Sequence, residues 1–250
     1  MEIEGKTALI TGGAQRVGKA ITLGLARAGA NVIVNYNQSA DEAEQTIREA
    51  EAMDVAGLAV QADISDWEQV QRMFEEINRK TKGVDILVNN SSLFLTTPVP
   101  TTDLENWHKV TGVLLNGAFY CSNLAAFNML EKKAGAIVNI VDLSLWEAWP
   151  RFTAHAVGKS GLMALTRQFA MELAPHVRVN AVCPGPVLPP DHYNEERIKR
   201  SANKTLLHRW GTPEDISKAV NFLVDADYIT GDVIIVDGGQ RFGHRQLEEG

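Results

Sequence analysis

The sequence predicts a doubly wound α/β fold with a parallel β-sheet, formed as a single domain by residues 1–250. Two observations lead to this prediction. Short runs rich in valine and isoleucine alternate with longer amphipathic segments along the whole chain. These runs are too apolar for strands with one face in water, and they suit strands that helices cover on both faces. Regular alternation of strands and helices implies βαβ units, whose parallel strands share one sheet.

The predicted strands begin with TALIT, which comes directly before a glycine-bearing turn. They cover residues 7–11, 31–36, 57–62, 85–90, 136–142, 177–182 and 232–237. The predicted helices lie between the strands and have apolar residues at helical spacing. They cover residues 16–28, 40–53, 66–80, 104–131, 154–174 and 213–225. Thr212 and Pro213 mark the start of the last helix, because threonine is a good cap and proline fits the first helical position.

Composition limits the classes of function. The chain is 45% hydrophobic and 22% charged, as is typical of globular proteins. Its net charge of -7 disfavours a general nucleic-acid binder, which needs a basic surface. Cys121 and Cys183 have no metal-binding spacing and fit a reducing compartment. With no run near ~18 apolar residues and no signal-peptide pattern, we expect a cytoplasmic protein without a metal or a membrane partner.

The turn after the first strand, ITGGAQRVGKA, is a candidate phosphate site. A glycine-bearing turn here lets backbone N–H groups approach a pyrophosphate at the positive end of a helix, as in Rossmann-type folds. The next strand ends in NYNQS, which has no carboxylate to bind the ribose of NAD. It offers Asn37, Gln38 and Ser39, and Arg16 adds a permanent positive charge. These residues favour NADP(H) over NAD(H).

The turn TGGAQRVG resembles the T-G-x-x-x-G-x-G turn of the short-chain dehydrogenases/reductases, with Arg16 where the middle glycine is usual. Together with NYNQSADEA, it is most similar to the pteridine reductase branch. Further matches to the family follow in the expected order: ADI (62–64), VNNSS (88–92), PGP (184–186), RWGTPEDI (209–216) and DGG (237–239). The turn, the strand end and this resemblance together assign a set of residues to NADP(H) binding. These are Gly12, Gln15, Arg16, Val17, Asn37, Gln38, Ser39, Asp63, Ile64, Asn89, Ser91, Lys159, Pro184, Gly185 and Val187.

The family's active site is an Asn-Ser-Tyr-Lys tetrad, in which pteridine reductases have Asp in place of Ser. The Y-x-x-x-K spacing falls on HAVGK, so the resemblance places Lys159 on the cofactor ribose and His155 at the tyrosine position. Asp142, thirteen positions before His155, agrees with the pteridine reductases. The usual asparagine falls on Leu114 and is absent. His155 and Lys159 are four residues apart and are expected to share one helix face.

These departures leave three alternatives for the chemistry. In the first, His155 replaces tyrosine as the general acid, because imidazole titrates near ~6.5. In the second, the chain binds NADP(H) but has impaired or no turnover, and it acts as a sensor or partner subunit. The absence of both the tyrosine and the asparagine supports this alternative. In the third, another residue gives the proton, and the candidates are Asp142, Tyr193 and His192.

The resemblance also points to a substrate. SSLF (91–94) is similar to the pteridine reductase segment whose aromatic ring stacks on the pterin, so Phe94 is a candidate for that contact. Trp146 and Trp149 follow Asp142 and are expected to line the same mouth. The proline-rich and then charged stretch 184–210, which includes Tyr193, is predicted to be a substrate lid.

The resemblance implies an NADPH-dependent oxidoreductase that reduces a pterin or another carbonyl or imine in a small-molecule substrate. The helix that follows Lys159 is apolar on more than one face, with Met163, Leu165 and Phe169 among its residues. Such a helix is buried on each of those faces. In this family the second face is usually covered by a partner subunit, so we expect a homodimer or homotetramer.

Overall fold

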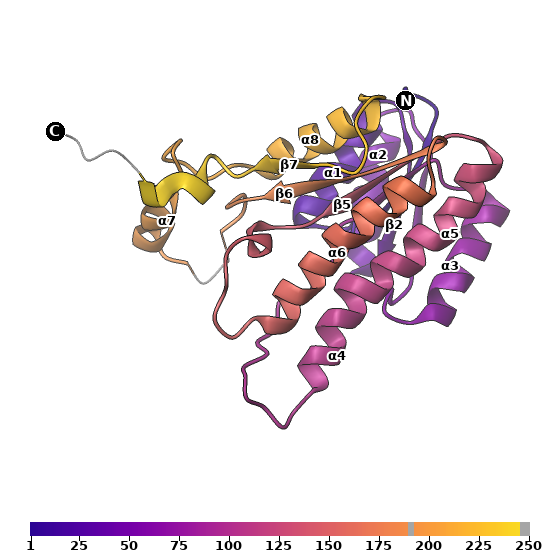
Figure 1. Ribbon diagram of the computed structural model, residues 1–250. Helices are drawn as coiled ribbons and strands as arrows, with labels where there is room; N and C mark the ends of the chain where they lie inside the picture. Colours follow the sequence, from indigo (N-terminus) through magenta and orange to yellow (C-terminus); the bar gives the residue numbers. More distant parts are fainter. Residues whose placement is uncertain (190–192, 246–250) are drawn as a thin grey trace.

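The computed structural model describes residues 1–189 and 193–245, without the side chains of residues 243–245. Within these residues, parallel strands form one sheet in the order β3-β2-β1-β4-β5-β6-β7 (Figure 1). The strands are β1 (Thr7–Thr11), β2 (Asn31–Tyr36), β3 (Gly57–Gln61), β4 (Ile86–Asn89), β5 (Gly135–Ile140), β6 (Val177–Pro184) and β7 (Val233–Val236). This topology confirms the doubly wound, Rossmann-type α/β fold in a single domain.

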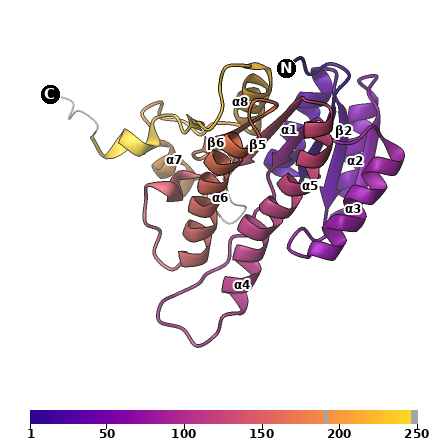
Figure 2. The ribbon, with the colours of Figure 1, turned by 45° about the vertical axis from the view of Figure 1, so that its right-hand side comes forward.

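Helices cover both faces of the sheet (Figure 2). One face carries α1 (Arg16–Arg27), α2 (Ala40–Glu51) and α8 (Pro213–Asp225). The other carries α3 (Trp67–Lys80), α5 (Ala118–Glu131) and α6 (Thr153–Glu172). Successive side chains of β1 point to opposite faces of the sheet. Leu9 packs in the hydrophobic layer under α3, α5 and α6, and Ile10 packs in the layer under α1, α2 and α8. This alternation explains why the strands are continuously apolar.

The predicted helix 104–131 is continuous in the structure but has three parts. These are α4 (Glu105–Thr111), a π-helical segment (Gly112–Gly117) and α5. By length and composition alone, Glu105–Glu131 is long and apolar enough to cross a membrane, and half of its most apolar window is buried. Its residues Cys121, Ala125 and Met129 pack in the core against the sheet. A buried core helix meets the same criteria, so they are weak evidence for a membrane span.

The strand order determines where a ligand can bind. β1 lies between β2 and β4, and the chain leaves it toward opposite edges of the sheet in its two halves. At such a switch point the loops after two neighbouring strands separate and leave a crevice at the carboxyl ends of the strands. The turn after β1 and the segment after β4 therefore form the two sides of that crevice.

Two predicted boundaries changed in ways that matter for the site. The predicted strand 136–142 ends at Ile140, so Asp142 lies beyond β5 and caps a 3₁₀ turn (Leu143–Leu145). In its described residues, 184–189 and 193–210, the predicted lid contains the helix α7 (Glu195–Ala202), between the end of β6 and α8. The final described turn is a 3₁₀ helix (Gln240–Arg245) that follows β7.

Candidate functional site

A cleft of about 750 Å³ lies over the carboxyl ends of β1 to β4. The turn after β1, the tips of β2 and β3, and the segment after β4 line it. Most of the predicted cofactor residues meet there: Gly12, Gln15, Arg16, Val17, Asn37, Gln38, Ser39, Asp63, Ile64 and Ser91. Residues more than 70 positions apart in the sequence thus share one groove, because the parallel strands all end at the same edge of the sheet.

The turn after β1 requires glycine at two positions. Gly12 has a φ of +61°, in the left-handed region that glycine adopts without a steric penalty. A Cβ on Gly18 would lie 2.1 Å from the carbonyl oxygen of Gly12, so the first turn of α1 approaches the loop too closely for any side chain. Arg16 has a φ of +53° although it is not a glycine. The backbone at this position keeps the left-handed conformation that suits a glycine, at a cost of roughly 1–2 kcal/mol.

Thr11 and Asn90 join the two sides of the crevice. The hydroxyl of Thr11 accepts hydrogen bonds from the backbone N–H groups of Asn90 and Ser91, at 3.0 and 3.1 Å. The Asn90 side-chain amide donates to the carbonyl oxygens of Thr11 and Gly12, at 3.0 and 3.1 Å. These bonds fix the glycine turn against the end of β4, so the backbone N–H groups of the turn have a defined direction.

Asn89 was assigned to the cofactor site, but the structure places it below the site. Its side chain is buried, and its amide donates to Asn139 Oδ1 at 2.8 Å and to Ser122 Oγ at 2.9 Å. Asn90, which had no assignment, lines the cleft. Because neighbouring side chains at a strand end point to opposite sides, only one member of the Asn89–Asn90 pair can face the groove.

The charges in the cleft favour an anionic ligand at its β2 end. The residues after β2 are Asn37, Gln38 and Ser39, and Gln15 donates from Nε2 to Ser39 Oγ at 2.9 Å. The carboxylate of Asp63 accepts from the backbone N–H and hydroxyl of Ser65, at 2.9 and 2.7 Å. Arg16 therefore brings a positive charge next to polar side chains, with the nearby carboxylate already engaged.

A second cavity of about 480 Å³ adjoins the first and shares Arg16, Val17, Asn90 and Ser92 with it. It brings together the predicted catalytic residues Asp142, His155 and Lys159. The predicted residues Phe94, Pro184 and Gly185 line the same cavity. The loop after β4, the end of β5, the start of α6 and the end of β6 thus converge on one space.

Asp142 and His155 form a close pair in this cavity. His155 Nε2 lies 2.6 Å from Asp142 Oδ2, and His155 Nδ1 lies 3.3 Å from the carbonyl oxygen of Leu93. A carbonyl and an ionised carboxylate only accept hydrogen bonds, so each of these bonds needs a ring nitrogen that carries a proton. The Asp142 carboxylate is therefore in direct contact with the imidazole ring. The His155 side chain is only 3% exposed, whereas that of Asp142 is 19% exposed.

The neighbours of Asp142 stabilise its ionised form. Burial alone would raise the pKa of Asp142, but the hydrogen bond from His155, the charge of Lys159 and the hydrogen bond from Ser144 hold this pKa below its ordinary value. Both the backbone N–H and the hydroxyl of Ser144 donate to Asp142 Oδ1, at 2.9 and 2.5 Å. Asp142 therefore keeps a fixed direction and a negative charge beside the cavity.

Lys159 lies on α6, one turn after His155, and its ammonium group donates to the carbonyl oxygen of Ile140 at 2.6 Å. The residue is only 3% exposed. Burial lowers the pKa of Lys159, and the Asp142 carboxylate opposes part of this shift. The ammonium group has further protons to donate, and these are available to a ligand in the cavity.

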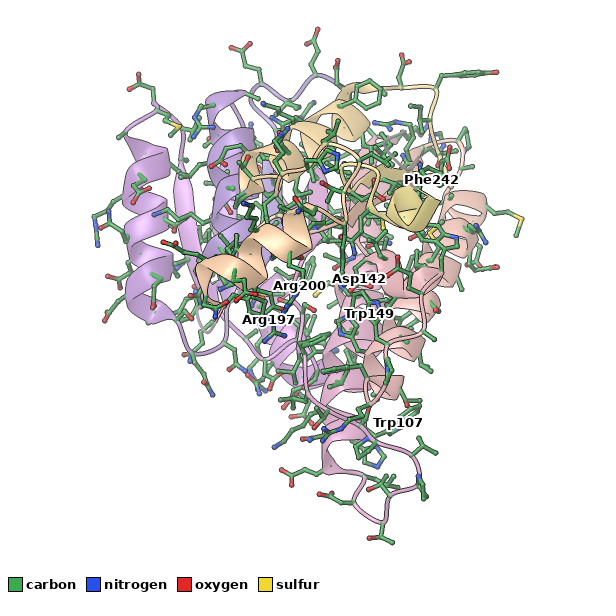
Figure 3. The ribbon with its side chains drawn as sticks, turned by 90° about the vertical axis from the view of Figure 1, so that its left-hand side faces the viewer. Trp107, Asp142, Trp149, Arg197, Arg200 and Phe242 are labelled. Atoms are coloured by element: carbon green, nitrogen blue, oxygen red, sulfur yellow. The ribbon has the colours of Figure 1, made fainter. Side chains whose placement is uncertain are left out.

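Aromatic rings surround His155. Phe94 meets the imidazole edge to face with ring centroids 4.7 Å apart, and Trp149 stacks on it at 5.8 Å. Phe94 also stacks on Phe152, with centroids 4.1 Å apart. Phe94 is nevertheless 53% exposed, so it has surface left to contact a ligand. Figure 3 shows Trp149 next to Asp142.

These features agree with the comparisons with known proteins. A family model described as enoyl-(acyl carrier protein) reductase matches residues 12–241. 3β-Hydroxysteroid dehydrogenase 1 of Eggerthella lenta is 34% identical over 248 residues, covering 95% of this chain and 94% of that protein. The chain belongs to the short-chain dehydrogenase/reductase family. It is therefore an oxidoreductase by family.

Other relatives and solved structures of short-chain dehydrogenases/reductases match the chain over nearly its whole length. The 3-oxoacyl-[acyl-carrier-protein] reductase FabG of Staphylococcus aureus is 34% identical, covering 94% of this chain and 97% of that protein. The structure of FolM alternative dihydrofolate reductase 1 from Brucella canis, complexed with NADP, has a TM-score of 0.90. It is 32% identical and covers 99% of this chain and 97% of that one.

Besides Asn89, three predicted site residues in the described part of this short-chain dehydrogenase/reductase line neither cavity. Trp146 is 55% exposed and lies outside the second cavity, where Trp149 is found instead. Val187 packs against the core under α1, α2 and α8. Tyr193 lies under the guanidinium of Arg197 in the α7 region. His192 lies outside the described residues.

Sequence analysis missed several residues that line the two cavities. Asn90 and Ser92 stand beside predicted residues in the segment after β4, where Asn90, Ser91 and Ser92 all line the first cavity. Lys109 reaches the first cavity from α4, and Gln240 reaches the second from the turn after β7. Ser201 reaches the second cavity from α7. Only the packing of distant elements could reveal these last three.

Proposed function

We propose that this protein is an NADPH-dependent reductase of the short-chain dehydrogenase/reductase type, acting on a carbonyl or imine of a flat ring such as a pterin. The observation that carries the proposal is the position of Asp142, His155 and Lys159. They line a cavity that opens beside the cleft formed by the glycine turn. In such a site the nicotinamide supplies a hydride when it is bound, and the protein supplies the proton.

The shape and charge of the first cleft support NADP(H). Gly18 leaves no room for a side chain against Gly12, as a turn that holds a pyrophosphate requires. The tip of β2 carries Asn37, Gln38 and Ser39 and no carboxylate that would repel a 2′-phosphate. Arg16 is the cation for that phosphate in this proposal. The NADP bound to the Brucella canis relative adds support from a similar fold.

Each residue of the second cavity has a distinct role in the proposal. Lys159 binds the ribose and adds positive charge beside Asp142. His155, which stands at the family's tyrosine position, does not reach the substrate, because both of its nitrogens have partners within the protein. Asp142 is the more exposed member of the pair. A proton passes from His155 Nε2 to Asp142 Oδ2 and from there to the substrate as the hydride arrives.

The aromatic surroundings support a flat substrate. The exposed part of Phe94 borders the cavity and offers a stacking surface for a heterocycle. The FolM alternative dihydrofolate reductase from Brucella canis is among the similar structures, which supports a pterin. In this proposal the stretch 184–210 acts as the substrate lid, since Leu188 and Ser201 line the same cavity. We further propose that the protein works in the cytoplasm as a homodimer or homotetramer.

A second function has its own support. His155 is almost fully buried, and both ring nitrogens are engaged, so no phenol-like group points into the cavity from this position. An NADP(H)-binding protein with impaired or no turnover, acting as a sensor or partner subunit, fits this observation. The two functions share the cofactor and differ only in the proton transfer.

Two measurements test these proposals. Fluorescence titration with NADPH tests the cofactor, and tight binding of NADH but not NADPH would overturn it. Turnover of a panel of dihydropterins, quinones and ketones tests the chemistry in wild type, His155→Ala and His155→Tyr. If wild type turns over a substrate and His155→Ala loses that activity, the non-enzymatic function fails. If wild type is inactive on every substrate and His155→Tyr gains activity, the reductase proposal fails.

A further inference from the structure

The helix α7 presents a basic edge at the second cavity. Its inward side consists of Ile198, Ser201, Ala202 and, in the following turn, Thr205. Ser201 lines the cavity together with Asp142. With 100° per residue, Arg197 lies only about 40° from Ser201 around the helix, on the side away from Ala202. Arg200 lies about 60° beyond Arg197 on the same side.

Figure 3 labels Arg197 and Arg200 below α7, and in this view they project on the side where Asp142 and Trp149 are labelled. Neither arginine lines the second cavity itself, but both belong to the helix whose Ser201 lines it. Arg16 lines the cavity and adds positive charge from another segment.

The charge of this segment contrasts with that of the whole chain. Residues 194–210 contain five basic and two acidic side chains, giving a local charge of +3 in a chain of net charge -7. Glu195 lies about 160° and Glu196 about 100° from Arg197 around the helix axis, so neither faces Arg197. Glu196 precedes Arg200 by one turn and lies about 40° from it, so it offsets part of the charge of Arg200.

Neither arginine has a carboxylate partner among the residues that the structure describes. Arg197 is held in place by an aromatic ring, with its guanidinium 3.9 Å from the centre of the Tyr193 ring. Tyr193 in turn meets Trp210 edge to face, and Trp210 Nε1 donates to the carbonyl oxygen of Ile198 at 3.0 Å. A guanidinium fixed by stacking keeps all of its N–H groups for another acceptor.

We propose that Arg197 and Arg200 form a subsite for a carboxylate on the substrate, beyond the ring that is reduced. This inference rests on the proposed function, because it takes the second cavity as the place of the reducible ring. A guanidinium matches a carboxylate with two parallel hydrogen bonds, so a substrate with an anionic tail is bound in one orientation. The subsite selects a carboxylate-bearing heterocycle over its neutral analogue.

The test compares two small probes that share a ring, pterin-6-carboxylate and 6-hydroxymethylpterin. Their binding to the full-length protein is measured by calorimetry at low ionic strength, with NADP⁺ present. The variant is Arg197→Gln/Arg200→Gln. The matched control is Lys199→Gln, which removes a positive charge from the same helix about 160° away from Ser201. NADPH binding is measured on all three proteins.

We expect wild type to bind the carboxylate about 10-fold or more tightly than the neutral probe, as charge-assisted hydrogen bonds allow. The double variant loses this preference, whereas Lys199→Gln keeps it, and NADPH affinity is unchanged in both. Equal binding of the two probes, no binding of either, or a preference that survives in the double variant would overturn the subsite.

Weaker NADPH binding in the double variant would also overturn the subsite, because the arginines would then serve the cofactor. The proposed function would stand in that case. Conversely, if wild type binds no NADPH, the proposed function fails, while the difference between the two probes still decides the carboxylate subsite. The two failures are thus distinguishable in one set of titrations.

Discussion

The two adjoining cavities of this molecule are built in different ways. The cofactor cleft depends on backbone: a glycine turn, strand ends and the Thr11–Asn90 bonds that join them. The second cavity depends on side chains from distant segments, above all the close pair of Asp142 and His155. The first follows the family pattern with one exception, Arg16. The second has His155 at the position where the resemblance to the family predicts a tyrosine.

This difference shows which part of the protein tolerates change. A backbone cradle needs small residues at a few positions, and a single Cβ can block it. A side-chain site can be rebuilt when one group replaces another, provided that hydrogen-bond partners and charges are also supplied. His155 has such partners in Asp142 and Leu93, and aromatic rings enclose it. Binding and chemistry should therefore respond separately to substitutions.

The largest expected effect comes from Asp142→Asn. If Asp142 passes the proton to the substrate, turnover falls by about 10²–10⁴-fold, the range for loss of a general acid. NADPH affinity stays close to that of wild type, because Asp142 does not line the first cleft. Steady-state kinetics and an NADPH titration on the same preparation check this. If Asp142→Asn kept the turnover of wild type, proton transfer would not depend on Asp142, and the assignment of the chemistry to the second cavity would fail.

The second test changes the cofactor cleft, so NADPH binding rather than proton transfer is expected to be lost. In Gly18→Ala the new Cβ would meet the Gly12 carbonyl oxygen at 2.1 Å and the Asn90 amide nitrogen at 2.7 Å, so the turn has to move. Such overpacking costs about 1–3 kcal/mol, and we expect NADPH affinity to fall by roughly 10–100-fold. Calorimetry measures the affinity, and circular dichroism checks that the protein is folded.

The matched control is Gly112→Ala, whose Cβ would come no closer than 3.2 Å to any neighbour, the Ser65 side chain. This control should keep its NADPH affinity nearly unchanged. If Gly18→Ala bound NADPH as well as the control does, the glycine turn would not be the phosphate cradle.

The variant Arg16→Gly tests whether Arg16 in the cofactor cleft binds the 2′-phosphate of NADPH. Loss of the charge should weaken NADPH binding by about 10-fold and leave NADH binding nearly unchanged, because only NADPH carries the 2′-phosphate. Stability should change by less than about 1 kcal/mol, because relief of the left-handed backbone and the larger entropy of the unfolded chain oppose each other. Calorimetry with both dinucleotides and urea unfolding measure the two quantities. An equal loss for NADH and NADPH would show that Arg16 does not bind the 2′-phosphate.

The smallest expected effect is the pH dependence of stability. The folded-state pKa of Asp142 lies below its ordinary value, so its contribution to stability is present above the unfolded-state pKa of about 3.9. This contribution is lost as the pH falls toward the folded-state pKa. The difference in unfolding free energy between wild type and Asp142→Asn should therefore shrink as the pH falls below about 4. Urea unfolding across this range checks it, and a difference that grows on acidification would contradict the ion pair.

The sequence alone determined the doubly wound sheet, because apolar strands covered on both faces and amphipathic helices leave separate periodic signals. It also determined most of the cofactor cleft, since a glycine turn at a strand end uses residues adjacent in the chain. Asp142, His155 and Lys159 were singled out by the resemblance to the family's tetrad, onto which the spacing of HAVGK falls.

Only the tertiary structure decided what the sequence left open. It decided that Asn90 rather than Asn89 faces the groove, and that Trp149 rather than Trp146 reaches the cavity. It also decided that both nitrogens of His155 are engaged, and that α7 brings Ser201 to the second cavity. The physical reason is the same in each case. Spacing along a chain fixes which residues share an element, but side-chain direction and hydrogen-bond partners depend on how distant elements pack against one another.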